Sequence, residues 1–189
     1  MTETPSEQSQ QSEQALQSAP SQQPAPPEPS GRPVRIRPAQ AADAAAIAQV
    51  HIRSREVTMP YLPPRRRTDA EVEAWVRDVV LPGSAVWVAE LDGAVVGYAA
   101  VEDDQLDALY LLADVRRRGI GTLLLAAAKA HRPQGLGLFV FQKNTGARAF
   151  YLRHGFTVTA ATDGSGNMER EPDLAMRWSP VTNGTRTVG

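Results

Sequence analysis

A turn rich in arginine and glycine is the first segment of this chain whose residue types could do chemistry. Arg116 to Arg118 are followed by Gly119 and Gly121, at the start of a stretch with helical character over 120–131. A helix N-terminus has unpaired N–H groups and a partial positive charge, and it therefore favours anions. Glycine lets the backbone approach a bulky ligand, and arginine has forked donors that suit phosphate. The segment indicates a diphosphate site, with a solvated arginine surface beside a plain turn as the alternative.

Two common nucleotide-binding motifs do not fit this turn. A P-loop has Gly-Lys-Ser or Gly-Lys-Thr at the start of its helix, and this helix start has no such triplet. A dinucleotide fingerprint, Gly-x-Gly-x-x-Gly, needs a glycine where this chain has Arg117, and its third glycine is also absent. Neither type of nucleotide site is therefore expected here.

A second segment downstream has its own pattern, Asn144-x-x-Ala147-x-x-Phe150-Tyr151-x-x-x-Gly155-Phe156. Asn144 suits the N-cap of a short helix, and Gly155 suits the position just past its end. Ala147 is small enough to allow a ligand or another element to approach closely. The plainest role for Tyr151 is at the edge of the core, with its hydroxyl group in water. Taken alone, the segment indicates a capped helix beside a strand.

Strands and helices must alternate to position both segments. Val34–Arg37 alternates apolar and basic residues as a half-buried strand does, and Asp92-Gly93 predicts a hairpin. The expected strands are 34–37, 85–91, 94–101, 106–112, 136–141, 156–160 and 174–178, and the expected helices are 44–55, 68–81, 120–131 and 144–154. The order β-α-α-β-β-β-α-β-α-β-β predicts an α/β fold, with a mixed, mostly antiparallel central sheet and flanking helices.

Two helix starts carry capping signals. Asp43 is an expected N-cap for the first helix, and Thr68 followed three residues later by Glu71 is a capping-box pattern. The second of these helices is expected to bury one face that carries Val72, Trp75, Val76 and Val79.

Composition separates a folded domain from two tails. Residues 1–33 are mostly Gln, Ser and Pro and contain no aromatic residue, so they bury too little apolar surface to order. We expect a disordered leader over 1–33, a folded domain over 34–178 and a loose tail over 179–189. A solvated spacer is the plain interpretation of the leader, and a docking tail is the alternative.

Charge and residue usage limit the partners. The net charge is −1, there is no cysteine, and the three histidines have no zinc-ligand spacing, so no metal and no nucleic acid are expected. The N-terminus has no basic stretch followed by an apolar one, and the apolar runs are too short to cross a bilayer. We expect a cytoplasmic protein without a membrane partner, and a homodimer is left open.

Together the two segments resemble the fingerprint of the GNAT acetyltransferase superfamily, and the likeness covers roughly 34–178. The resemblance implies acetyl-CoA as co-substrate, direct attack by an amine on its thioester, and Tyr151 as the general acid that protonates the CoA thiolate. An ordinary tyrosine has a pKa of about 10, so it can donate a proton at neutral pH. The implied acetyl-CoA contacts are Leu109, Tyr110, Leu111, Arg116, Arg117, Arg118, Gly119, Ile120, Gly121, Thr122 and Asn144.

The proton acceptor for the amine is the weaker part of this resemblance. Many members have a glutamate early in the central strand, where this chain has Gln105, which is no base. Asp107 shares that face of the strand and is a candidate base, with a water chain or an already neutral amine as alternatives. A non-catalytic acyl-CoA-binding sensor would need the phosphate turn but neither acid nor base.

The amine acceptor is expected near two loops. The loop around Tyr61, between the first two helices, would form one wall of its pocket, and the hairpin loop 162–173 would form another or would serve as a surface turn. The acceptor is expected to be a small-molecule or peptide amine.

Overall fold

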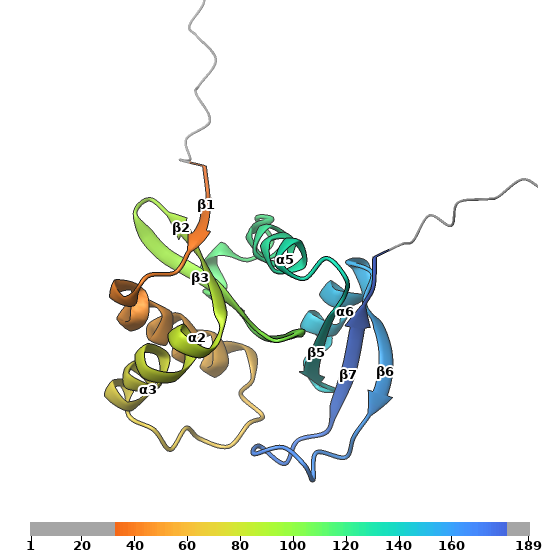
Figure 1. Cartoon of the computed structure of the whole chain (residues 1–189). Helices are drawn as coiled ribbons and strands as arrows, with labels where there is room; N and C mark the ends of the chain where they lie inside the picture. Colours follow the sequence, from red (N-terminus) through yellow and green to blue (C-terminus); the bar gives the residue numbers. More distant parts are fainter. Residues whose placement is uncertain (1–32, 181–189) are drawn as a thin grey trace, which may run out of the picture. The chain divides into compact units, whose positions relative to one another are not determined.

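The computed structural model describes residues 33–180 of the chain, so the predicted leader and tail lie almost wholly outside it. A seven-stranded sheet runs through this part in the order β1-β2-β3-β4-β5-β7-β6 (Figure 1). Neighbouring strands are antiparallel except β4 and β5, which are parallel. The strands are β1 Arg35–Pro38, β2 Ala85–Leu91, β3 Ala94–Glu102, β4 Gln105–Leu111, β5 Leu136–Phe141, β6 Thr157–Ala161 and β7 Asp173–Trp178.

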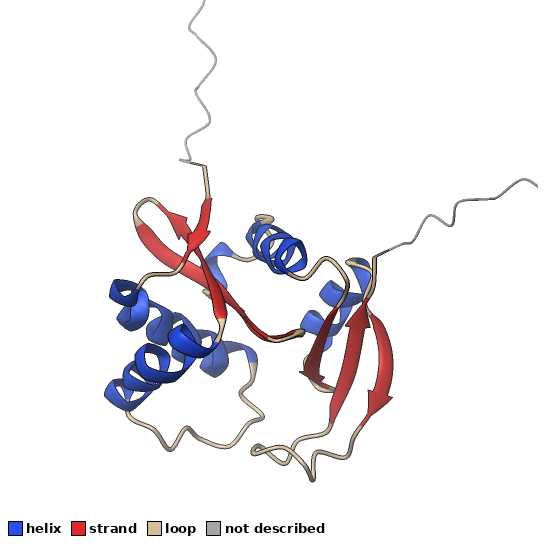
Figure 2. Cartoon of the chain, viewed as in Figure 1, coloured by secondary structure: helices blue, strands red, loops and turns tan. Residues whose placement is uncertain are grey.

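Helices cover both faces of the sheet (Figure 2). On one face, α2 and α3 pack on the side chains of Val88, Tyr98 and Ala108. On the other face, α5 and α6 pack on Leu106, Leu138 and their neighbours. The helices are α2 Ala44–Thr58, α3 Asp69–Trp75, α4 Leu81–Gly83, α5 Ile120–His131 and α6 Thr145–Arg153, with a π-helical stretch Val76–Val80 and 3-10 turns Ala41–Asp43 and Ala113–Val115. The predicted element order and the mixed, mostly antiparallel sheet are confirmed.

The two central strands separate along their length. β4 and β5 pair at a single position, Gln105 with Gly137, and an additional bond joins the Gly137 N–H to the Asp104 carbonyl. The remaining residues of β4 have no partner on β5, so the sheet opens from this point toward Leu111 (Figure 1). The opening lies between two well-paired halves, β1 to β4 and β5 to β6.

Short sequence motifs predicted a helix start and a hairpin turn correctly. Thr68 Oγ1 accepts a hydrogen bond from the Glu71 N–H, and Glu71 Oε2 accepts one from the Thr68 N–H, so the predicted capping box is present. Asp92 and Gly93 have φ of 52° and 81°, as the predicted tight hairpin requires.

Two local predictions were wrong. The Asp43 carboxylate does not cap α2, because it accepts hydrogen bonds from Arg37 and from the Gln40 N–H instead. Val79 is 56% exposed, since the chain winds as a π-helix over Val76–Val80 and rotates this side chain off the buried face.

Candidate active site

The arginine-glycine turn has the backbone shape of an anion cradle. Arg117 and Gly119 both have positive φ, 60° and 81°, and Gly119 occupies the N-cap of α5 without any side-chain cap. A Cβ on Gly119 would meet nothing within 4 Å, so the space above this helix end is open. The first N–H groups of α5 have no partner within the helix and face that space. The backbone shape of this turn is compatible with a diphosphate, and the binding itself stays a prediction.

The three arginines differ in what they contact. The Arg116 guanidinium donates to Thr58 Oγ1 at the end of α2 and to the Leu111 carbonyl, 3.3 Å away. Ser54 also donates to this carbonyl, at 2.7 Å. Arg116 thus fastens the end of β4 to α2, whereas the exposed Arg117 and Arg118 are available to a ligand.

The open edge of β4 carries unpaired backbone groups. The Leu112 N–H donates to the Val96 carbonyl on β3. Because the bonded direction alternates along an antiparallel strand, the N–H groups of Leu109 and Leu111 point away from β3, toward the opening. The Leu111 side chain lies over Gly97, where a Cβ would be 2.3 Å from its Cδ2. These contacts hold the end of β4 in place beside the opening.

The second predicted segment flanks the same opening. Asn144 Oδ1 accepts a hydrogen bond from the Ala147 N–H at 3.1 Å, so Asn144 caps α6. Tyr151, two turns along, is buried beside Phe150 and Phe156. Burial raises the pKa of its phenol, and the neighbouring Tyr110 raises it further. Tyr151 is therefore fully protonated at neutral pH, as a proton donor must be.

Tyr110 reaches this neighbourhood from the opposite face of the sheet. Its ring stacks on Tyr98 at 5.7 Å and lies 4.9 Å from His51 of α2, centroid to centroid. Tyr151 belongs to the core below α5. β4 and β5 pair only at Gln105 and Gly137, so the sheet is open along the part of β4 that carries Tyr110. The opening thus joins the face that carries the phosphate turn to the face covered by α2 and α3.

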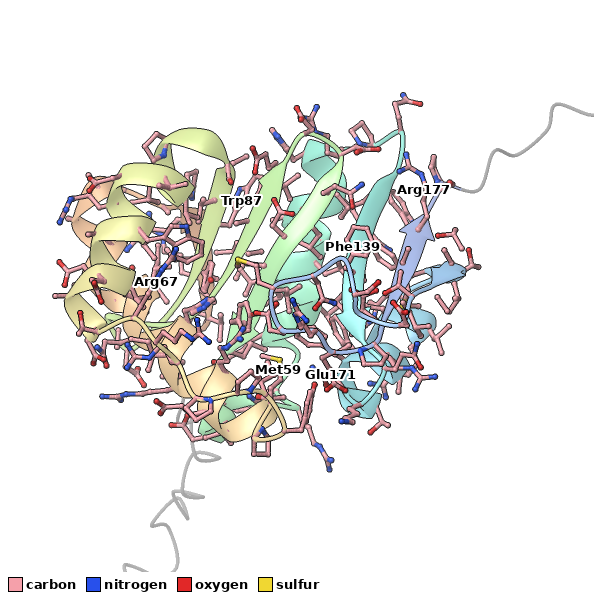
Figure 3. All side chains as sticks on the ribbon, turned by 90° about the horizontal axis from the view of Figure 1, so that it is seen from below. Met59, Arg67, Trp87, Phe139, Glu171 and Arg177 are labelled. Carbon is pink, nitrogen blue, oxygen red and sulfur yellow. The ribbon has the colours of Figure 1, made fainter. Side chains whose placement is uncertain are left out.

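The expected acceptor loops lie on that second face. Arg55 of α2 forms a 2.8 Å ion pair with Glu169 of the hairpin loop. The Lys143 ammonium lies 5.6 Å from the Tyr61 ring centre, and Tyr61 meets Phe141 edge to face. Figure 3, viewed from below, labels Met59 just past α2 and Glu171 of the hairpin loop, in the two segments that the Arg55–Glu169 ion pair joins. A pocket of about 590 Å³ lies beside the hairpin loop and is lined by Phe139, Val140, Phe141, Thr162, Ser165, Gly166, Asn167, Glu169 and Asp173.

The predicted base lies elsewhere on β4. Asp107 is exposed at a bulge in the β3–β4 pairing. Burial of part of its carboxyl group raises its pKa, and so do Glu102 and Asp103 at the β3–β4 turn. Gln105 lies over Gly137, where a Cβ would be 2.5 Å from its Nε2. Burial raises the pKa of Tyr110 and of Tyr61, and a carboxylate adds to each effect: Glu169 for Tyr110 and Glu171 for Tyr61. Sequence reasoning missed both, because in the chain they look like part of a surface turn.

Comparisons with known proteins agree with this geometry. Residues 82–158 match the model of the Acetyltransferase (GNAT) domain. The chain is 34% identical over 131 residues to the peptidyl-lysine N-acetyltransferase YjaB of Salmonella typhimurium, covering 69% of this chain and 88% of that protein. It is 32% identical to the peptidyl-lysine N-acetyltransferase YiaC of Escherichia coli, covering 65% and 83%.

Solved structures show the same fold. Apo YjaB from Escherichia coli superposes with a TM-score of 0.63 at 27% identity, over 78% of this chain and 98% of that one. The protein yncA from Salmonella typhimurium, solved with acetyl-CoA, superposes with a TM-score of 0.62 at 25% identity, over 78% and 94%. These likenesses define an enzyme of the N-acetyltransferase class. The chain belongs to the GNAT acetyltransferase family, which confirms the resemblance of its two motifs.

Two further properties concern residues 33–180 only. No group of three or more His, Asp or Glu side chains in this range is arranged to hold a metal ion. No helix in the same range is long and apolar enough to cross a membrane.

Proposed function

We propose that this N-acetyltransferase takes its acetyl group from acetyl-CoA and passes it directly to a primary amine, with both substrates bound together. The observation that carries the proposal is the meeting of three features at one opening of the sheet. These are the uncapped N-terminus of α5, the unpaired edge of β4 and the protonated Tyr151. Holding both reactants at one place supplies much of the rate by itself.

Each predicted contact has a role in this proposal. Arg117, Arg118, Gly119 and the first N–H groups of α5, at Ile120, Gly121 and Thr122, would hold the diphosphate. The Leu111 N–H would polarise the thioester carbonyl, and Leu109 would bind the pantetheine arm. Asn144 and Tyr110 would border that arm. Arg116 would act indirectly, because its contacts with Thr58 and the Leu111 carbonyl hold the end of β4 in place.

Tyr151 would protonate the departing thiolate. Its burial keeps the phenol neutral until the thiolate forms, and a neutral phenol is the form that donates. Asp107 remains one candidate for the opposite proton transfer, from the amine. The domain that carries this activity would span residues 34–178, flanked by the segments 1–33 and 179–189.

The acceptor we propose is a lysine side chain in a protein or peptide. Support comes from the two relatives, YjaB and YiaC, whose names record peptidyl-lysine as the group they acetylate.

A thiol-release assay tests the proposal with acetyl-CoA and a panel of amines that includes a lysine peptide, an alkylamine and a free amino acid. We expect turnover with the peptide, and a loss of roughly 100-fold or more in kcat for Tyr151→Phe at unchanged acetyl-CoA affinity. Binding of acetyl-CoA without turnover on any amine would favour the sensor alternative and refute the enzyme.

A further inference from the structure

A histidine at the end of α6 reaches the first turn of α5. The His154 Nε2 atom lies 3.1 Å from the Thr122 hydroxyl oxygen. The other ring nitrogen, Nδ1, lies 2.8 Å from the Phe150 carbonyl oxygen. Thr122 is among the expected acetyl-CoA contacts, whereas His154 is not. His154 therefore joins a residue of the phosphate turn to the helix that carries Tyr151.

Packing holds the imidazole ring of His154 in place. The ring lies 4.3 Å from the Phe150 ring, centroid to centroid. Phe150 packs in turn on the first turn of α5, since a Cβ added to Gly121 would lie 3.5 Å from its ring. The Lys129 ammonium of α5 donates to the His154 carbonyl at 2.6 Å. These contacts fix the partner of each ring nitrogen.

Thr122 lies where the diphosphate would bind. The first hydrogen bond along α5 runs from the Leu123 N–H to the Gly119 carbonyl, at 3.2 Å. The Thr122 N–H precedes it and is therefore one of the N–H groups that have no partner within the helix. The Thr122 side chain is exposed. Its hydroxyl group is thus a candidate donor to any phosphate that these N–H groups bind.

The two ring contacts determine where the hydrogen atoms of His154 lie. A carbonyl oxygen only accepts, so Nδ1 carries a hydrogen. In a neutral imidazole the second nitrogen has none, so Nε2 accepts the hydrogen of the Thr122 hydroxyl. A phosphate oxygen is also an acceptor and needs a donor. Neutral His154 and a bound phosphate therefore compete for the same hydroxyl hydrogen.

Protonation of His154 removes this competition. An imidazolium donates from both ring nitrogens, so Nε2 would donate to the Thr122 oxygen. The hydroxyl hydrogen is then available to the phosphate. Histidine is the side chain whose charge ordinarily changes near neutral pH, so a nearby diphosphate can decide its protonation state.

The charged groups near His154 are cations. Lys129 of α5 contacts its carbonyl, Arg153 precedes it on α6, and Arg117–Arg118 lie in the turn before α5. β7 contributes the uncharged Trp178, whose ring centre is 4.4 Å from the Lys129 ammonium. Within residues 33–180, no carboxylate forms an ion pair with His154. An additional positive charge is therefore opposed in the free enzyme and is favoured once a diphosphate binds.

We propose that His154 takes up a proton when acetyl-CoA binds, and that the imidazolium turns the Thr122 hydroxyl toward a diphosphate oxygen. The inference rests on the proposed function and makes His154 a positioning residue for its co-substrate. The proton comes from solvent and bonds to Nε2, whose N–H donates to Thr122 Oγ1, and the hydroxyl hydrogen passes into a bond with phosphate. Because the complex binds more protons than the free enzyme, acetyl-CoA affinity falls as pH rises.

Calorimetric titration of the full chain with acetyl-CoA tests this proton uptake. PIPES and Tris at the same pH have unequal ionisation enthalpies, so the difference in apparent binding enthalpy gives the protons taken up. We expect net uptake in the parent enzyme, and an uptake lower by up to about one proton in His154→Gln, because glutamine gains no charge. The parent Kd should rise between about pH 6 and 8, by up to roughly tenfold per pH unit, and more steeply than that of His154→Gln.

Matched variants separate this role from a structural one. His131→Gln makes the same change at the exposed C-terminal end of α5 and should match the parent enzyme in uptake and Kd. Thr122→Ser keeps the hydroxyl and should keep the uptake. Thr122→Val removes the hydroxyl, and it should lower the uptake and weaken acetyl-CoA binding roughly tenfold or more.

A truncated donor gives a second readout. Acetyl-pantetheine has the thioester but no diphosphate, so His154→Gln should lower kcat/KM for acetyl-CoA more than for acetyl-pantetheine. Equal losses with the two donors would mean a general structural role and would overturn the inference. Equal proton uptake in the parent enzyme and His154→Gln would overturn it as well. If the parent enzyme does not bind acetyl-CoA at all, the proposed function fails instead.

Discussion

Gly119 provides the sharpest test of the phosphate turn, because the chain contains a matched glycine elsewhere. Gly119 and Gly93 both have φ of 81°, and a Cβ on either would meet nothing within 4 Å. Alanine at either position therefore costs about 1–2 kcal/mol of folding free energy from left-handed backbone strain alone. Only Gly119 stands at the N-terminus of α5, whereas Gly93 lies in the β2–β3 hairpin. Alanine therefore introduces the same backbone strain at both positions, but only at Gly119 would it also meet the ligand.

Gly119→Ala should weaken acetyl-CoA binding far more than Gly93→Ala. The added methyl group enters the open space above the helix, and losing one charge-assisted hydrogen bond to phosphate costs about 1.5–3 kcal/mol. That is roughly a 10- to 150-fold rise in Kd. Calorimetric titration measures Kd, and urea unfolding checks that both variants lose similar stability. Equal affinity in Gly119→Ala and the parent enzyme, or an equal loss in Gly93→Ala, would refute the assignment.

Two predictions concern stability. Burial, aided by Arg55, lowers the pKa of His51 to about 4, so the folded protein keeps it neutral while the unfolded chain binds a proton below about pH 6.5. Stability should therefore fall as pH drops from 6.5 to 4, by about 3 kcal/mol from this group, and urea unfolding of His51→Gln should lack that component. Thr68→Ala removes the capping box of α3 and should cost about 1 kcal/mol in the same assay, with Thr68→Ser restoring it; an unchanged midpoint would contradict the cap.

Much of the fold follows from short-range signals that the sequence carries openly. The strand over Ala85–Leu91 and the helix over Ile120–His131 have the bounds that periodicity predicts, because turn residues close both ends. The predictions that Asp43 caps the first helix and that Val79 is buried were wrong, and the reasons are also local. Arg37, a cross-turn neighbour, outcompetes the helix end for the Asp43 carboxylate, and a π-helical stretch shifts the phase at Val79.

The residues of the candidate site also fall into two groups, those fixed by neighbours in sequence and those fixed by long-range contacts. The helix start at Gly119 and the Asn144 cap depend on neighbours in sequence and could be predicted from them, whereas phosphate binding at Gly119 stays a prediction. The contact of Arg116 with Thr58 joins residues 58 positions apart, and nothing local signals it. Glu171 looks like a solvated turn residue in the chain, and only tertiary packing buries it to 9% exposure. Long-range packing, which the residue type does not reveal, therefore decides that this carboxylate is buried.

The central claim is transfer of an acetyl group from CoA to a lysine amine at the opening between β4 and β5. The most direct measurement follows acetyl-CoA labelled in its acetyl group, with a lysine peptide, by intact-mass analysis and thiol titration in one reaction. We predict one labelled acetyl group on the peptide lysine for each CoA released, and near-complete loss of both products with Tyr151→Phe. Thiol release without labelled peptide, or full activity in Tyr151→Phe, would contradict the account.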